Sequence, residues 1–173
     1  SEEGEFTFST IEEVIHHILP DVDREIFSLL DVREIKRKAY VIVAADRGLS
    51  GSFNANILKA AQNEIDTFGK ENVDLFCIGK KARDYFKRRE YTIIESHVDF
   101  WSDMEFDSAM KIGRSIVDHF VSGKVDEIHV LYNYFISVGQ QKVKSEVLLP
   151  LSYDEIIIDR KSTRLNSSHE WIS

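Results

Sequence analysis

The sequence predicts an α/β fold, in which a doubly wound and mostly parallel sheet is sandwiched by helices. Tyr40–Ala45 is an uninterrupted apolar run rich in β-branched residues, which is typical of a strand buried on both faces. Gly48 and Gly51 bracket a tight loop after this run, and helical spacing of the apolar residues begins at Phe53. Strand, glycine loop and helix open a βαβ unit, and strands and helices alternate along the rest of the chain.

Two strand–helix units make up the first half of the predicted domain. The apolar residues keep helical spacing from Phe53 to Phe68, and Gly69 is suited to end this helix as a C′ glycine. Val73–Ile78 is a second apolar run and predicts another buried strand. A short helix with mostly basic side chains is expected over Lys80–Arg89.

The second half repeats this alternation. Tyr91–Glu95 predicts a third strand, and Ser102-x-x-Glu105 is a capping box that opens a helix reaching Phe120. The last two strands are expected at Glu127–Phe135 and Val143–Leu151. The second of these could run antiparallel to the rest of the sheet.

The residues before the first strand are less regular. A seam of apolar residues recurs at steps of three and four and then meets Pro20, which indicates a short amphipathic helix packed on the domain's own core. The seam consists of Phe8, Ile11, Ile15 and Ile18. Asp21–Arg33 is an acidic connector without a strong period, and Lys36-Arg37-Lys38 is expected to be a solvated basic run ahead of the strand.

Composition limits the class of protein. The 173 residues are 43% hydrophobic and 30% charged, as in soluble globular proteins, and the net charge of −8 argues against general nucleic-acid binding. Cys77, the one cysteine, is expected to be a small buried core residue. No apolar stretch approaches the ~20 residues that span a bilayer, so direct membrane insertion is not expected. Residues 160–173 lose the apolar periodicity and are interpreted as a non-native tail.

The motifs of catalysis are missing from the sequence. Gly48-x-x-Gly51 lacks both the third glycine of a dinucleotide site and the Gly-Lys-Ser/Thr ending of a phosphate loop. The histidines, among them His97, lack metal-ligand spacing, and no Gly-x-Ser-x-Gly elbow occurs. We therefore assign no catalytic residue, no metal ligand and no cofactor. One alternative stays open, a free-standing nucleotide- or phosphate-binding domain that uses the Gly48–Gly51 loop and the Lys80–Arg89 helix.

Three strings carry a family resemblance. Asp46-Arg47-Gly48-Leu49-Ser50-Gly51, followed by Phe53-Asn54-x-Asn56, resembles the D-R-G-L-C-G-G-x-N-x-N stretch of the γ subunit of F-type ATP synthases. Ile78-Gly79-Lys80-Lys81-Ala82-Arg83-Asp84-Tyr85-Phe86 is similar to the family's I-G-K-K-x-R-D-F-F. Tyr132-Asn133-x-Phe135-x-Ser137, Gln141-Lys142 and Glu146-x-Leu148-Leu149-Pro150-Leu151 resemble its Y-N-x-F-x-S, Q-K and E-x-L-L-P-L. The strings keep the family's order over roughly residues 6–151.

The resemblance implies a non-catalytic rotor shaft that couples proton flow through a membrane ring to ATP synthesis. Its partners would be the α and β subunits of the catalytic hexamer, an ε-type subunit and the membrane c-ring. The loop of Asp46, Arg47, Gly48, Leu49, Ser50 and Gly51 would lie near an acidic loop of a catalytic β subunit, with Ser50 where the family usually has cysteine. A second group would lie near the ε-type subunit or the membrane ring, namely Tyr132, Asn133, Phe135, Ser137, Gln141 and Lys142.

The resemblance also implies a division of the chain. Residues 1–20 would be the end of a long N-terminal coiled-coil helix, 21–35 a connector, 36–159 the α/β domain and 160–173 the tail. The subunit would be peripheral, on the cytoplasmic face of a bacterial inner membrane or the matrix side of a mitochondrial one.

Overall fold

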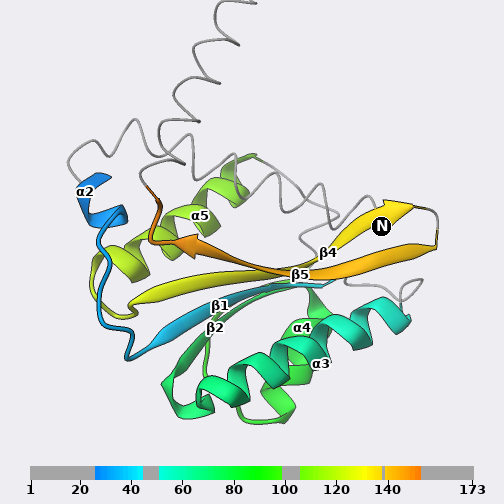
Figure 1. Cartoon of the computed structure of the whole chain (residues 1–173). Helices are drawn as coiled ribbons and strands as arrows, with labels where there is room; N and C mark the ends of the chain where they lie inside the picture. The colour runs from blue at the N-terminus through cyan, green and yellow to red at the C-terminus, as the bar shows by residue number, and fades with distance from the viewer. Residues whose placement is uncertain (1–25, 45–50, 99–105, 138, 153–173) are drawn as a thin grey trace, which may run out of the picture.

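A computed structural model describes residues 26–44, 51–98, 106–137 and 139–152. Five strands form one sheet in the order β3-β2-β1-β4-β5, with helices on both of its faces (Figure 1). The elements are α2 (Ile26–Leu29), β1 (Lys38–Val43), α3 (Gly51–Phe68), the 3₁₀ turn η2 (Lys70–Asn72), β2 (Val73–Ile78), α4 (Lys80–Arg88), β3 (Ile93–His97), α5 (Phe106–Val121), β4 (Glu127–Ser137) and β5 (Gln140–Leu149).

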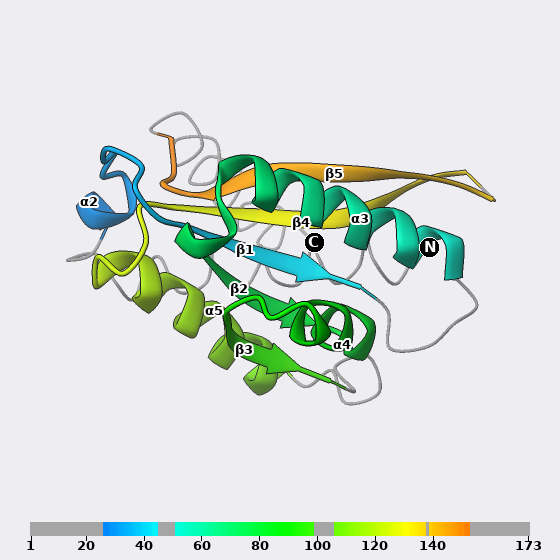
Figure 2. The ribbon, with the colours of Figure 1, turned by 90° about the horizontal axis from the view of Figure 1, so that it is seen from below.

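The strand directions confirm the predicted doubly wound, mostly parallel sheet. Strand β1 pairs in parallel with β2 and with β4, and β2 pairs in parallel with β3. Strand β5 runs antiparallel to β4, which confirms the direction considered for the last strand. Figure 2 shows α3 lying along β4 and β5, with α4 beside β2 and β3, while α5 covers the opposite face in Figure 1.

Strand β1 explains why the first apolar run has no polar face. Ala39, Val41 and Val43 belong to the core on the α5 side of the sheet. Tyr40, Ile42 and Ala44 alternate with them and belong to the core on the α3 side. Because successive side chains of a strand point to opposite faces, a strand between two helical layers needs apolar residues throughout.

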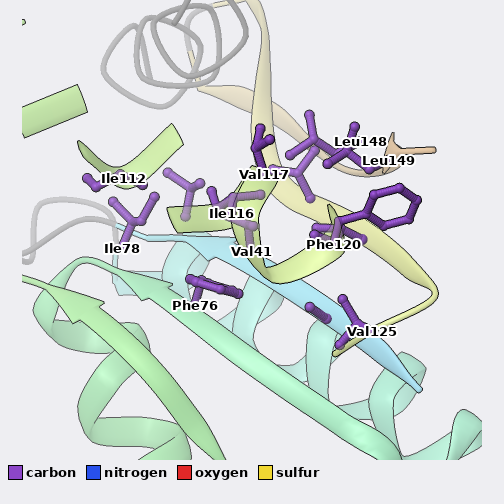
Figure 3. Packing of buried hydrophobic residues seen from close by; sticks show 14 of the residues in the cluster. Val41, Phe76, Ile78, Ile112, Ile116, Val117, Phe120, Val125, Leu148 and Leu149 are labelled. Carbon is purple, nitrogen blue, oxygen red and sulfur yellow. The ribbon is translucent and has the colours of Figure 1, made fainter. Parts of the chain in front are cut away.

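Two close-packed cores result from this arrangement. On one side, α5 contributes Ile112, Ile116, Val117 and Phe120 against Val41, Phe76 and Ile78 of the sheet (Figure 3). On the other side, α3 and α4 bury apolar stripes, made of Ile57, Leu58, Ala61, Ile65, Ala82 and Phe86. Burial of this kind contributes about 25 cal/mol for each Å² of apolar surface removed from water.

Several element boundaries differ from the predictions by a few residues. The third strand begins at Ile93 rather than Tyr91, because the Tyr91 ring packs into the α3-side core ahead of the strand. The fifth strand begins at Gln140 rather than Val143, since it pairs with β4 as far as Ser137. The predicted connector contains the short helix α2, whose Leu29 is fully buried.

The prediction of a solvated basic run before β1 is wrong for two of its three residues. Arg37 binds the carboxylate of Asp74. The ammonium nitrogen of Lys38 lies 3.7 Å from Oε1 of Glu127 and 4.5 Å from the centre of the Phe68 ring. Partners distant in the sequence hold both side chains, so a local pattern could not reveal them. The Phe8–Ile18 seam and residues 160–173 lie outside the described residues.

Candidate partner-contact surfaces

The first predicted contact region follows strand β1. Asp46, Arg47, Gly48, Leu49 and Ser50 lie outside the described residues, and Gly51 is the first residue of α3. The structure therefore fixes the two ends of this loop, Ala44 and Gly51. The amide of Ala44 donates to the carbonyl oxygen of Ile78 at 2.9 Å, so the chain is still held against β2 where the loop begins.

The second predicted contact region forms a projecting hairpin. Strand β1 pairs with β4 only as far as Leu131, whereas β4 continues to Ser137 and pairs there with β5. We call residues 132–144 without residue 138 the arm, a two-stranded ribbon that extends past the rest of the sheet (Figure 1). Gly139, with φ of 79°, is at its turn, where a positive φ is needed for a tight hairpin.

Side-chain contacts hold the two strands of the arm together. The Tyr132 hydroxyl donates to Oε1 of Glu146 at 3.0 Å, and the Tyr132 side chain is buried. The ammonium group of Lys144 lies 3.7 Å from the centre of the Tyr134 ring. Cross-strand contacts of this type each contribute about 0.2–1 kcal/mol to the pairing of β4 with β5.

The tip of the arm is exposed. Ile136, a large apolar residue, is 50% exposed, and Ser137, Gln140 and Lys142 are exposed around it. The hydroxyl of Ser137 donates to Oε1 of Gln140 at 3.3 Å across the turn. The tip therefore presents one large apolar side chain among exposed polar ones.

The carboxyl end of β1, from which the first region follows, lies beside the start of the arm on β4. Strands β1 and β4 are parallel, and Ile42 faces Leu131 at the last pair of their ladder. The loop leaves from the carboxyl end of β1, and the arm begins on β4 directly after Leu131. The carboxyl ends of β1 and β4 also form the switch point of the sheet, where ligands of open α/β folds bind.

Asp74, Arg37 and His119 form a charge cluster that sequence reasoning missed at the opposite, amino end of β2. Asp74 is 4% exposed and His119 is 7% exposed. One carboxylate oxygen of Asp74 accepts from the Arg37 guanidinium and the other lies 2.8 Å from Nε2 of His119. Burial alone would raise the pKa of Asp74, but the hydrogen bonds from Arg37 and His119 lower it below its usual value. The Asp74 carboxylate in turn raises the pKa of Arg37.

Two open grooves flank the sheet. One, of ≈ 320 Å³, runs between α5 and β3 over Phe76 and is lined by Glu95, Asp118 and Lys124. The other, of ≈ 590 Å³, runs between α3 and strands β1 and β4, where the Tyr40 and His129 rings stack with centroids 5.1 Å apart.

The charged groups of the larger groove bond within the chain. Glu127 contacts both Lys38 and His129, and Glu64 accepts from the Ser145 hydroxyl at 2.9 Å. Burial, together with Glu64 and Glu127, raises the pKa of Tyr40. His119 and His129 each have a carboxylate partner, as expected of structural histidines.

Metal and thiol chemistry find no support in the described part of the chain. Over residues 26–44, 51–98, 106–137 and 139–152, His, Cys, Asp and Glu side chains nowhere gather in a group able to hold a metal ion. Cys77 is fully buried on β2, as predicted, and burial raises the pKa of its thiol to about 12. The helices in these ranges are too short or too polar to cross a bilayer.

The chain is similar to known γ chains in sequence. A family model described as ATP synthase matches residues 2–171. The ATP synthase gamma chain of Desulforamulus reducens is 42% identical over 123 residues, covering 71% of this chain and 43% of the relative. That of Chlorobium phaeobacteroides is 31% identical over 166 residues, covering 92% of this chain and 56% of the relative. A gamma chain of Acetobacterium woodii, named sodium ion specific, is 36% identical over 138 residues, covering 80% and 44%.

Solved structures show the same fold. A chain of the central stalk and c-ring of the Tetrahymena thermophila mitochondrial ATP synthase aligns with a TM-score of 0.55 at 18% identity, covering 86% of this chain and 71% of that one. A rotor chain of the Euglena gracilis mitochondrial ATP synthase aligns with a TM-score of 0.52 at 19% identity, covering 87% and 56%. The chain spans about half the length of the curated relatives it matches. Since the family model matches nearly every residue and the relatives are γ chains, the chain belongs to the γ-chain family of ATP synthases.

Proposed function

We propose that the chain is the α/β part of a rotor subunit, which couples proton flow through a membrane ring to ATP synthesis by rotation. Membership of the γ-chain family is the observation that carries this proposal. The similar structures come from a rotor and from a central stalk with its c-ring, which are the assemblies such a subunit would join. The subunit itself is non-catalytic in this proposal.

The mechanical demand on such a subunit is stiffness. A sheet buried on both faces supplies it, because side chains packed to crystal-like density transmit strain with little compression. The helices α3 and α5 brace the two faces of the central strands, so a force on one edge of the sheet is carried by the whole domain.

The proposed partners would meet the domain at the carboxyl edge of β1 and at the arm. The loop that contains Arg47 would contact a catalytic β subunit, and the exposed tip at Ile136 would contact an ε-type subunit or the c-ring. The α subunits would surround the long helices, and the subunit would be peripheral on the cytoplasmic or matrix side of the membrane. One relative is named sodium ion specific, whereas we propose protons as the coupling ion for this chain.

A domain exchange tests this proposal. Residues 26–152 of this chain would replace the matching region of the D. reducens γ chain, its 42% identical relative, in a complex reconstituted in vesicles. We expect gradient-driven ATP synthesis that an uncoupler abolishes. A matched control would carry an unrelated α/β domain at the same junctions. A complex that assembles and hydrolyses ATP, but makes no more ATP under a gradient than this control, would overturn the proposed function.

A further inference from the structure

The segment that leads into strand β1 is fixed to the domain although it has no regular secondary structure over most of its length. We call residues 30–37 the strap. It begins directly after Leu29, whose side chain is fully buried in the α5-side core. It ends at Arg37, next to the first residue of β1.

Arg33 binds the end of helix α5 from the middle of the strap. Its Nη1 donates to the carbonyl oxygens of Phe120 and Val125, each at 2.9 Å. The guanidinium carbon lies 4.3 Å from the centre of the Phe120 ring, and Nε donates to Oδ2 of Asp31 at 3.0 Å. A cation at the C-terminus of a helix is favourable, because the helix dipole is negative there.

Asp126 holds the last part of the strap. Its Oδ2 accepts from the backbone amides of Lys36 and Arg37 at 2.9 and 3.0 Å. The backbone amide of Asp126 donates to the carbonyl oxygen of Arg37 at 2.8 Å. These bonds set the entrance to β1 but leave the middle of the strap to Arg33.

Leu29, just before the strap, lies beside Leu151, near the end of the described residues. The amide of Leu151 donates to the carbonyl oxygen of Leu29 at 2.7 Å, and Leu149 and Leu151 share the core of Leu29. Figures 1 and 2 both show the end of β5 next to α2 and the strap. The strap therefore begins beside the last described residues of the domain.

We propose that Arg33 is a positioning residue, which locks the strap onto α5 and so holds the segment between Leu29 and strand β1 in one orientation on the domain. The part of this inference that concerns torque rests on the proposed function: a rotor needs a stiff junction between the α/β domain and its helices. Lysine could not replace Arg33, because a single ammonium lacks the planar fork that contacts two carbonyls, a carboxylate and a ring together.

Spin-label distances on the complete 173-residue chain test the inference without any partner. One label would be placed on the strap at Val32, which is 82% exposed, and one at the exposed Lys81 of α4, as Val32→Cys and Lys81→Cys. Cys77→Ser removes the native thiol. We expect a narrow distance distribution with Arg33, and a distribution at least about twofold wider with Arg33→Met, because the strap then samples more orientations.

Arg114→Met serves as a matched control, because Arg114 is an arginine of α5 that pairs with exposed Asp118. We expect it to leave the distribution unchanged. An unchanged width in Arg33→Met, with the near-UV circular dichroism of a folded domain, would overturn the inference. If Arg33→Met unfolds the chain, Arg33→Lys is measured in its place. A broader distance distribution in Arg33→Lys supports the inference, and an unchanged width contradicts it. Failure of the domain exchange described above would leave this result standing, so the two proposals fail separately.

Discussion

The carboxylate of Asp74 lies 2.8 Å from Nε2 of His119 and thereby joins strand β2 to the last turn of helix α5. The other oxygen of the same carboxylate accepts from Arg37, which precedes β1. Because an ionised carboxylate can only accept, Nε2 of His119 carries the proton of this bond. One buried side chain thus ties together two neighbouring strands and the helix that covers them.

Replacing Asp74 by asparagine is expected to destabilise the fold by about 2–3 kcal/mol, because it leaves the Arg37 charge and the His119 ring without their shared anion. Urea unfolding at neutral pH measures this loss. Asp118→Asn is the control, since Asp118 is an exposed carboxylate on the same helix as His119, and its effect should stay within about 0.5 kcal/mol. Equal effects of the two substitutions would show that the buried cluster is not important for stability.

The stabilisation by Asp74 should also depend on pH in one direction. The folded-state pKa of Asp74 is lowered, so its contribution is fully present above the unfolded-state pKa of about 3.9 and is lost as the pH falls through the folded-state value. We therefore expect the difference in unfolding free energy between wild type and Asp74→Asn to shrink as the pH falls below about 4. A difference that grows as the pH falls below about 4 would contradict the assigned sign.

The buried run of β2 could be predicted residue for residue, since Val73–Ile78 is apolar on both faces apart from Asp74. The arm was harder to predict from the sequence. Beyond Leu131, β4 no longer pairs with β1, and the polar residues of the arm show no pattern of burial. The contacts of Arg33 and Arg37 could not be predicted at all. Arg33 contacts Phe120, 87 positions away, and Arg37 contacts Asp74, 37 positions away. Partners so distant in the sequence leave no mark on the local pattern around a side chain.

The Cys77 thiol is expected to resist alkylation in the folded protein. It is fully buried, and burial raises its pKa to about 12, so little thiolate is present at pH 8. Iodoacetamide labelling followed by mass spectrometry should show modification only at urea concentrations that unfold the chain. Rapid labelling at pH 8 without urea would mean that β2 opens locally, contrary to its central place in the sheet.

The exposed tip of the arm is expected to matter for assembly and not for folding. Ile136→Asp places a charge on a side chain that is 50% exposed, so the unfolding midpoint of the free chain should change little. In the γ-chain exchange, the same substitution should weaken the retention of an ε-type subunit or of the c-ring during gel filtration. Val147→Asp, on a similarly exposed β5 residue outside the arm, is the control. If both variants retain the ε-type subunit and the c-ring equally well, the tip of the arm is not part of the interface.

The most direct test of the rotor proposal is to watch the domain turn. In the exchanged complex, a bead would be attached through Lys81→Cys on the exposed face of α4, with Cys77→Ser as background and the catalytic hexamer fixed to glass. The proposal predicts that ATP drives continuous rotation of the bead in one direction, and that rotation stops when ATP is removed. A bead that stays still or only fluctuates, on complexes that hydrolyse ATP at the normal rate, would contradict the proposal that this chain is part of a rotating shaft.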